Sequence, residues 1–150
     1  MRVIVAGSRT ITDYNQVKSI IEATLQSHRI DIINVTELVS GMAKGVDLLA
    51  VRWANEIGLP VKPFPADWQD LSNPCVVKWR KDGSVYNALA GFNRNLKMAL
   101  YADILIAIWD GVSNGTEHMI NTAKENGLII YLKQVVSTPP DIPPITYEGL

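Results

Sequence analysis

Short apolar runs alternate along the chain with longer segments that have the hydrophobic spacing of a helix. The apolar runs 2–6, 32–39, 61–65, 104–109 and 128–132 predict strands, and segments 13–28, 44–57, 87–101 and 115–126 predict helices. Strands that alternate with helices of this length are joined by right-handed crossovers into a parallel sheet. The pattern therefore predicts an α/β fold with a doubly wound, mainly parallel sheet of five strands and helices on both faces.

Two segments depart from this alternation. Segment 66–86 is predicted to be irregular, and a loop of this length in a compact domain is usually either a functional lid or disordered. Its residues Trp68 and Trp79 argue against disorder, because each either stacks on a planar ligand or, as is commoner, covers hydrophobic surface.

The end of the chain is rich in proline, which favours an extended arm. We expect one domain over residues 1–132 and a proline-rich tail over residues 133–150.

Three of the predicted strands end in polar turns that contain glycine. The turns cover residues 7–10, 40–47 and 110–117, and the first two carry Arg9 and Lys44. Because ligands of open α/β sheets bind beyond the carboxyl ends of the strands, these turns should converge on one crevice. Glycine allows close backbone approach, and free N–H groups at a helix start attract phosphate. The alternative is that the turns are ordinary connections between strands and helices. Asp47 would then only stabilise the dipole of its helix from the first turn.

Composition narrows the classes of partner. The 150 residues have a net charge of -1, which gives no basic surface for nonspecific binding to nucleic acid or to an anionic membrane. The single Cys75 excludes an internal disulfide, and His28 and His118 offer no zinc spacing, so we expect no metal site. No cofactor is expected either. Neither a signal peptide nor a long apolar span is apparent, so a cytoplasmic location is expected.

Several motifs together resemble the YspA/cpYpsA-related branch of the SLOG superfamily, over residues 1 to about 132. The motifs are Val3 to Arg9, Ser40 to Asp47, Arg94-Asn95 with Met98, and Ser113 to Thr116. The resemblance implies a Rossmann-like fold and a pocket for a nucleotide or nucleotide-derived ligand. It implies that this pocket is lined by Gly7, Ser8, Arg9, Ser40, Gly41, Gly45, Asp47, Arg94, Gly115 and Thr116. The same turns and motifs add Lys44, Asn95, Gly111, Ser113 and Asn114 as candidates, and Trp68 for stacking on a base.

One position departs from the enzymes of this superfamily. The LOG phosphoribohydrolases have a Pro-Gly-Gly-x-Gly-Thr-x-x-Glu motif, whose Glu takes part in cleaving an N-glycosidic bond, and Met119 stands at that position here. The remaining candidates for a catalytic carboxylate are Asp47, Asp110 and Glu117. Glu117 lies about 200° around a regular helix from Met119, and Asp110 is equally suited to forming a turn.

Three functions are consistent with these observations. The first is binding of a nucleotide-like ligand by a sensor or processing domain, and the second is hydrolysis of the N-glycosidic bond of a nucleoside monophosphate. The third is binding of single-stranded DNA, as the DprA members of the superfamily suggest, although the net charge argues against it. The apolar content also permits a homo-oligomer.

Overall fold

Five parallel strands form the main sheet of the protein. The structure is a computed structural model that describes residues 1–72 and 75–136. The strand order is β3-β2-β1-β6-β7, and every neighbouring pair is parallel. The strands are β1 (Arg2–Gly7), β2 (Glu37–Ser40), β3 (Val61–Pro63), β6 (Ile104–Trp109) and β7 (Ile129–Gln134). The predicted five-stranded parallel sheet is confirmed, and its strand order reverses between β1 and β6.

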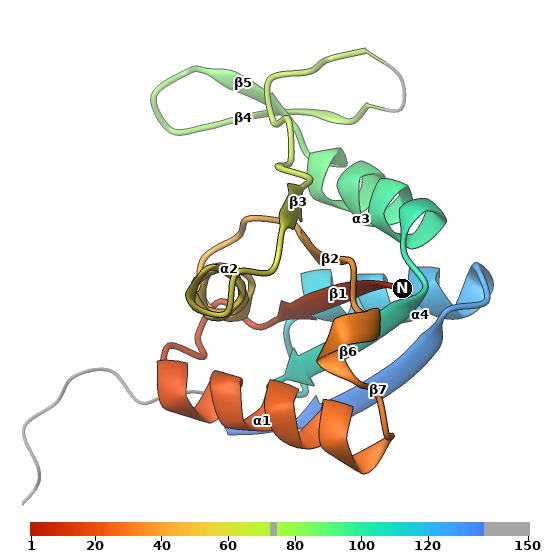
Figure 1. Ribbon diagram of the computed structural model, residues 1–150. Helices are drawn as coiled ribbons and strands as arrows, with labels where there is room; N and C mark the ends of the chain where they lie inside the picture. Colours follow the sequence, from red (N-terminus) through yellow and green to blue (C-terminus); the bar gives the residue numbers. More distant parts are fainter. Residues whose placement is uncertain (73–74, 137–150) are drawn as a thin grey trace, which may run out of the picture.

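Two pairs of helices cover the two faces of this sheet (Figure 1). Helices α1 (Tyr14–Ser27) and α2 (Val46–Glu56) pack on one face, and α3 (Ala90–Tyr101) and α4 (Asn114–Glu125) pack on the other. Successive strand residues point to opposite faces. On β1, Val3 and Val5 therefore join the core beneath α1 and α2, while Ile4 and Ala6 join the core beneath α3 and α4. The doubly wound arrangement predicted from the sequence is confirmed.

The predicted strand 32–39 is wrong over its first half. Residues Ile32–Asn34 form a short 3-10 helix, η1, and β2 begins only at Glu37. The Asp31 carboxylate accepts a hydrogen bond from the Ile33 N–H at 3.1 Å and so stabilises the turn. The Ile33 side chain is 81% exposed, which shows that an apolar run need not be buried.

Part of the segment predicted to be irregular is a β-hairpin. Strands β4 (Val77–Trp79) and β5 (Val85–Asn87) pair antiparallel, and Figure 1 shows them standing away from the main sheet. Gly83 has a φ of +88°, and the Arg80 N–H donates to the Ser84 carbonyl at 2.8 Å to close the turn. An Asp-Gly pair between β-branched and aromatic residues is a hairpin signal that the irregular assignment overlooked.

The ends of two other elements also differ from the prediction. Helix α3 begins at Ala90 rather than at residue 87, because Asn87 belongs to β5 and its side chain accepts from the Leu89 N–H at 2.9 Å. Strand β7 continues to Gln134, which pairs with Trp109. Most of the predicted tail, residues 137–150, lies outside the described residues.

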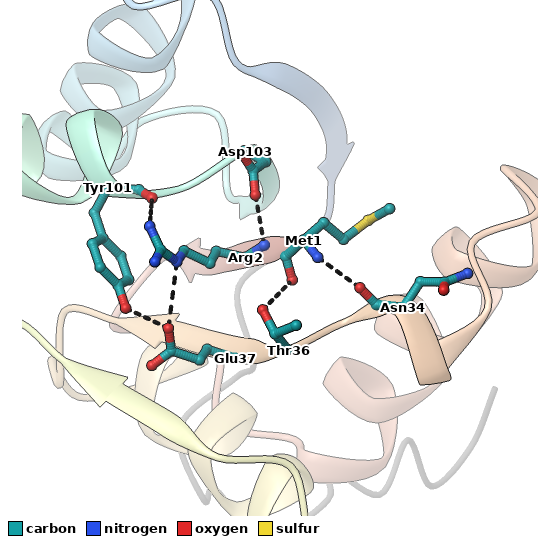
Figure 2. A network of polar contacts seen from close by, with 7 residues as sticks. All are labelled: Met1, Arg2, Asn34, Thr36, Glu37, Tyr101 and Asp103. Carbon is teal, nitrogen blue, oxygen red and sulfur yellow. Dashed lines mark hydrogen bonds and ion pairs between the residues drawn. The ribbon is translucent and has the colours of Figure 1, made fainter.

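Polar side chains close the amino edge of the sheet (Figure 2). The three glycine-bearing turns follow the other ends of the strands. The Arg2 side chain lies 3.5 Å from Glu37 and donates to the Tyr101 carbonyl at 3.2 Å, and the Tyr101 hydroxyl donates to Glu37. The Arg2 backbone N–H donates to Asp103 at 2.8 Å. Here the polar side chains satisfy one another, and they tie β1, β2 and the end of α3 together.

Candidate functional site

A cleft of about 340 Å³ lies at the carboxyl edge of the sheet, beside the point where the strand order reverses. Its walls come from the end of β1, the turn before α2, the arm that precedes α3, and the facing parts of α3 and α4. They are Ala6, Gly7, Arg9, Thr10, Ala43, Asp47, Trp68, Ala88, Gly91, Phe92, Arg94, Asn95, Met98, Ser113, Asn114, Gly115, Thr116 and Met119. This is the place in an open α/β sheet where a ligand is expected.

The turn after β1 brings one cation into the cleft. A Cβ at Gly7 would lie 2.2 Å from the Ile108 carbonyl oxygen, so only glycine allows β1 to pass this closely. Ser8 is buried, and its Oγ accepts the Asp110 N–H at 2.9 Å. Arg9 is exposed and lines the cleft, and within the described residues its guanidinium makes no hydrogen bond or ion pair. Arg9 is therefore available to an anion.

The turn after β6 leaves the start of α4 open to the cleft. The Asp110 carboxylate accepts the N–H groups of Val112 and Ser113, at 2.9 and 2.8 Å, and the Ser113 hydroxyl at 2.8 Å. Since the Ser113 hydroxyl is used there, it does not cap α4. In the described part of the chain, the N–H groups of Asn114, Gly115 and Thr116 have no partner, and all three residues line the cleft. Free N–H groups at the positive end of a helix dipole form an anion site.

The Asp110 side chain thus stabilises the conformation of this turn. Partial desolvation alone would raise the pKa of its carboxyl, but the hydrogen bonds from Val112, Ser113 and Ser8 outweigh it and hold the pKa well below its usual range. The carboxylate remains ionised and committed to the turn, and Asp110 does not line the cleft.

The turn after β2 is held in an unusual conformation. Met42 has a φ of +60°, which is uncommon for a residue with a side chain. The buried Ser40 accepts the Met42 N–H on its Oγ at 3.1 Å. Gly45 has a φ of +81°, and a Cβ there would lie 2.5 Å from the Ser8 carbonyl oxygen. The second turn is therefore packed directly against the first.

The Asp47 carboxylate joins these two turns and faces the cleft. It accepts the Gly7 N–H and the Ala43 N–H, each at 3.3 Å, and only 5% of the residue is exposed. Burial raises the pKa of Asp47 to about 6, although Arg94, the two N–H groups and Arg9 each act to lower it. A buried carboxyl that changes charge near neutral pH in a cleft is suited to act as a general acid or base.

The raised pKa of Asp47 predicts how stability depends on pH. In the unfolded chain this carboxyl ionises near its ordinary value of about 4, whereas in the folded protein it retains its proton up to about pH 6. The free energy of unfolding should therefore fall as the pH rises from about 4 to about 6, by about 2 to 3 kcal/mol from this group. Urea unfolding measured across this range should show the fall in the native protein and not in Asp47→Asn. Parallel profiles for the two proteins would contradict the assignment.

Arg94 connects the remaining walls of the cleft. Its Nη1 donates to the carbonyls of Gly41 and Phe64, and its Nε donates to the Asn95 side-chain oxygen at 3.0 Å. Burial lowers the pKa of Arg94, with Asp47 opposing this effect and Arg9 adding to it. The resemblance implied that Arg94 lines the ligand pocket, and it does line the cleft. In the structure most of its donors hold the protein together, and only Nη2 is not used in these bonds.

Asn95 extends this connection to α4. Its Nδ2 donates to the Gly115 carbonyl at 3.3 Å and lies 3.1 Å from His118 Nδ1. The His118 ring stacks on Phe92, with ring centroids 3.8 Å apart. Arg94 and Asn95 therefore position the start of α4 relative to the turn after β2.

Two aromatic side chains form flat parts of the cleft wall. Trp68 lines the cleft, beside Gly91 and edge-on to Tyr86 at 6.5 Å between ring centroids. Phe92 lines it from α3 and was not among the candidates from the sequence. Its spacing of three from Asn95 places both on one helix face, and this was the available signal. Trp79 is 70% exposed on the hairpin and is not part of the cleft.

The structure brings most of the candidate residues together. The cleft contains Gly7, Arg9, Asp47, Trp68, Arg94, Asn95, Ser113, Asn114, Gly115 and Thr116, and Gly41 lines an adjoining cavity. Other candidates shape the turns without lining the cleft, namely Ser8, Ser40, Gly45, Asp110 and Gly111, of which Gly111 has a φ of +87°. Lys44 and Glu117 are exposed and line neither cavity.

Neither a metal-binding cluster nor a membrane-spanning helix is found among the described residues, 1–72 and 75–136. No cluster of three or more His, Cys, Asp or Glu side chains could hold a metal ion there. Over the same ranges, no helix has the length and apolar character needed to cross a membrane.

Comparisons with known proteins agree with this architecture. Residues 1–70 match the family model described as YAcAr: YspA, cpYpsA-related SLOG family, which confirms the predicted resemblance over this part of the chain. The solved structure of DNA processing protein A (DprA) from Streptococcus pneumoniae is similar, with a TM-score of 0.61 and 22% identity. The similarity covers 99% of this chain and 52% of that one, so this chain spans about half of the DprA chain. It shows a shared Rossmann-like fold. No curated protein matches the chain.

Proposed function

We propose, for a chain whose residues 1–70 match the YspA, cpYpsA-related SLOG family, that the cleft binds a nucleotide or nucleotide-derived ligand through its phosphate. The observation that carries this proposal is that two anion-binding features meet in one cleft. These are the uncapped start of α4 and the guanidinium of Arg9. The domain would act as a sensor of such a ligand or as part of the machinery that processes it.

The rest of the cleft suits the other parts of a nucleotide. Trp68 and Phe92 offer aromatic surfaces against which a base can stack, and the buried Asp47 carboxylate can accept a hydrogen bond from a ribose hydroxyl. A volume of about 340 Å³ lies within the range of small-molecule sites. These features support a mononucleotide-sized group with its phosphate at the start of α4.

Calorimetric titration with AMP and GMP, each beside its nucleoside, tests this function. We expect saturable binding of at least one nucleotide, and binding of its nucleoside at least tenfold weaker, because the nucleoside lacks the charge that Arg9 and α4 attract. Absence of binding for every nucleotide, or equal affinity for nucleotide and nucleoside, would overturn the proposal.

Hydrolysis of an N-glycosidic bond is a second candidate, and the position of Asp47 favours it. Among the described residues, Asp47 supplies the only carboxylate that lines the cleft, whereas Met119 occupies the place of the LOG-type Glu and is 1% exposed. Asp47 with its raised pKa could activate a water molecule or stabilise charge on the ribose.

Release of free base from nucleoside monophosphates tests this second candidate. If hydrolysis occurs through Asp47, Asp47→Asn should lower the rate about 100-fold or more while still binding AMP. Full turnover in this variant would exclude Asp47 as the catalytic carboxylate. An inactive native protein that still binds AMP would leave the binding function as the proposal.

Nothing in the cleft supports the two remaining expectations from the sequence, which are binding of single-stranded DNA and a homo-oligomer. Its lining has two arginines and one aspartate rather than a basic groove, and the net charge is -1, so single-stranded DNA binding is not proposed. A homo-oligomer stays a prediction.

A further inference from the structure

A second cavity adjoins the cleft at the carboxyl edge of the sheet. The cleft of about 340 Å³ is called lobe A here, and lobe B is an open cavity of about 150 Å³. Lobe B is lined by Gly41, Met42, Ala43, Pro65, Ala66, Arg9, Trp68 and Arg94. Arg9, Ala43, Trp68 and Arg94 line both lobes, so the two arginines stand where the lobes meet.

The charges at this boundary limit the charge of a ligand. Within the described residues, Arg9, Arg94 and Asp47 are the charged side chains that line the two lobes. Among these side chains, two arginines against one ionised aspartate leave one net positive charge. Most of the Arg94 donors are already bonded to Gly41, Phe64 and Asn95, so one open cation, Arg9, remains. Such a boundary suits a group with a single negative charge.

We propose, resting on the proposed function, that the ligand is a phosphodiester whose phosphate lies between Arg9 and the start of α4, with one organic group in lobe A and the other in lobe B. A diester phosphate carries one negative charge and an organic group on each side. Both properties match a boundary that has one open cation and a cavity on each side of it.

A phosphomonoester matches this boundary less well, both in its charge and in the number of its organic groups. Its terminal phosphate has no second substituent to enter lobe B. At neutral pH it carries between one and two negative charges, and the additional charge would face the Asp47 carboxylate. The structure therefore favours diesters over monoesters of the same nucleoside.

Three probes separate the effects of charge and of lobe B. AMP has a monoester phosphate, the methyl ester of AMP has a diester phosphate and almost no second group, and adenylyladenosine has a diester phosphate that joins two nucleosides. We expect the methyl ester to bind at least threefold more tightly than AMP at pH 7.5. Adenylyladenosine should bind at least tenfold more tightly than the methyl ester. Calorimetric titration gives all three dissociation constants.

Two alanines allow each lobe to be filled separately. Ala66 lines lobe B alone and Ala88 lines lobe A alone. Ala66→Phe should reduce the preference for adenylyladenosine over the methyl ester to less than threefold, and Ala88→Phe should weaken both probes at least tenfold. Ile33→Phe, at a side chain that is 81% exposed on η1, is the matched control and should keep the native values. Far-ultraviolet circular dichroism and the melting temperature establish that each variant is folded.

The outcomes distinguish this inference from the proposed function. If AMP binds as tightly as both diesters, or if Ala66→Phe leaves the preference for adenylyladenosine at tenfold, the diester inference is wrong and nucleotide binding stands. If none of the three probes binds and GMP does not bind either, the diester inference is wrong and the proposed function fails with it. The ordered affinities, together with the loss of preference in Ala66→Phe alone, support the inference.

Discussion

Replacing Arg9 by alanine should weaken the binding of AMP about 10- to 100-fold. The Arg9 guanidinium lines the cleft and is not held by a hydrogen bond or ion pair within the described residues, so all of its donors are available to a phosphate. A hydrogen bond to an ionised group contributes about 1.5 to 3 kcal/mol, and each 1.4 kcal/mol corresponds to a factor of ten in the dissociation constant. Because Arg9 is exposed, its removal should change the melting temperature little.

Matched variants show whether this loss belongs to the site. Arg9→Lys keeps the charge but not the planar pair of donors, so its affinity for AMP should lie between those of the native protein and Arg9→Ala. Arg52→Ala removes an exposed arginine from α2 that lines neither lobe, and it should bind AMP normally. If Arg9→Ala and Arg52→Ala bind AMP equally well, Arg9 is not a phosphate ligand.

Replacing Gly7 by alanine should have the largest effect on stability, a loss of about 3 kcal/mol or more. The added Cβ would lie 2.2 Å from the Ile108 carbonyl oxygen and within 2.8 Å of the Val46 side chain. Because the nearest atom belongs to the backbone of the neighbouring strand, β1 and β6 would have to separate. For a domain of this size the melting temperature should fall by roughly 6 to 12 °C. Thermal unfolding followed by circular dichroism measures the change.

Gly115→Ala is the matched control for this effect, because a Cβ at Gly115 meets nothing within 4 Å. Its melting temperature should be unchanged or slightly raised, since alanine favours a helix more than glycine does. The new methyl group would nevertheless narrow the cleft beside the free N–H groups of α4, so AMP binding should weaken. Equal melting temperatures for Gly7→Ala and Gly115→Ala would contradict the account of close strand packing.

The framework of the fold was predictable because the central strands of the main sheet, β1 and β6, are apolar runs in the sequence. The run Ile104 to Trp109 is apolar at every position, as expected for a parallel strand that is covered on both faces, and its boundaries were predicted without error. The run that begins at Ile32 was wrongly predicted to be a strand from its first residue, because burial of an apolar run depends on tertiary packing. The Asp31 side chain and a short turn placed Ile32 and Ile33 at the surface instead.

The candidate site was predictable as a meeting of turns, but the roles of individual side chains were not. Parallel strands bring their carboxyl ends to one edge, and this rule alone placed Arg9 and Thr116 in the same region. The sequence could not show that the Asp110 carboxylate accepts hydrogen bonds from its own turn and from the turn after β1, or that Arg94 is bonded to the Gly41 carbonyl. These roles depend on side-chain directions, which are set only once the helices are packed.

Nuclear magnetic resonance titration with AMP shows whether the phosphate binds between Arg9 and the start of α4, because it reports where on the protein the ligand binds. We expect progressive, saturable shifts of the backbone N–H signals of Asn114, Gly115 and Thr116 and of the Arg9 side chain. We expect little change at the amino edge of the sheet, around Asn34 and Asp103 (Figure 2). Saturable shifts confined to that opposite edge, with the signals at the start of α4 unmoved, would contradict binding of the phosphate at this site.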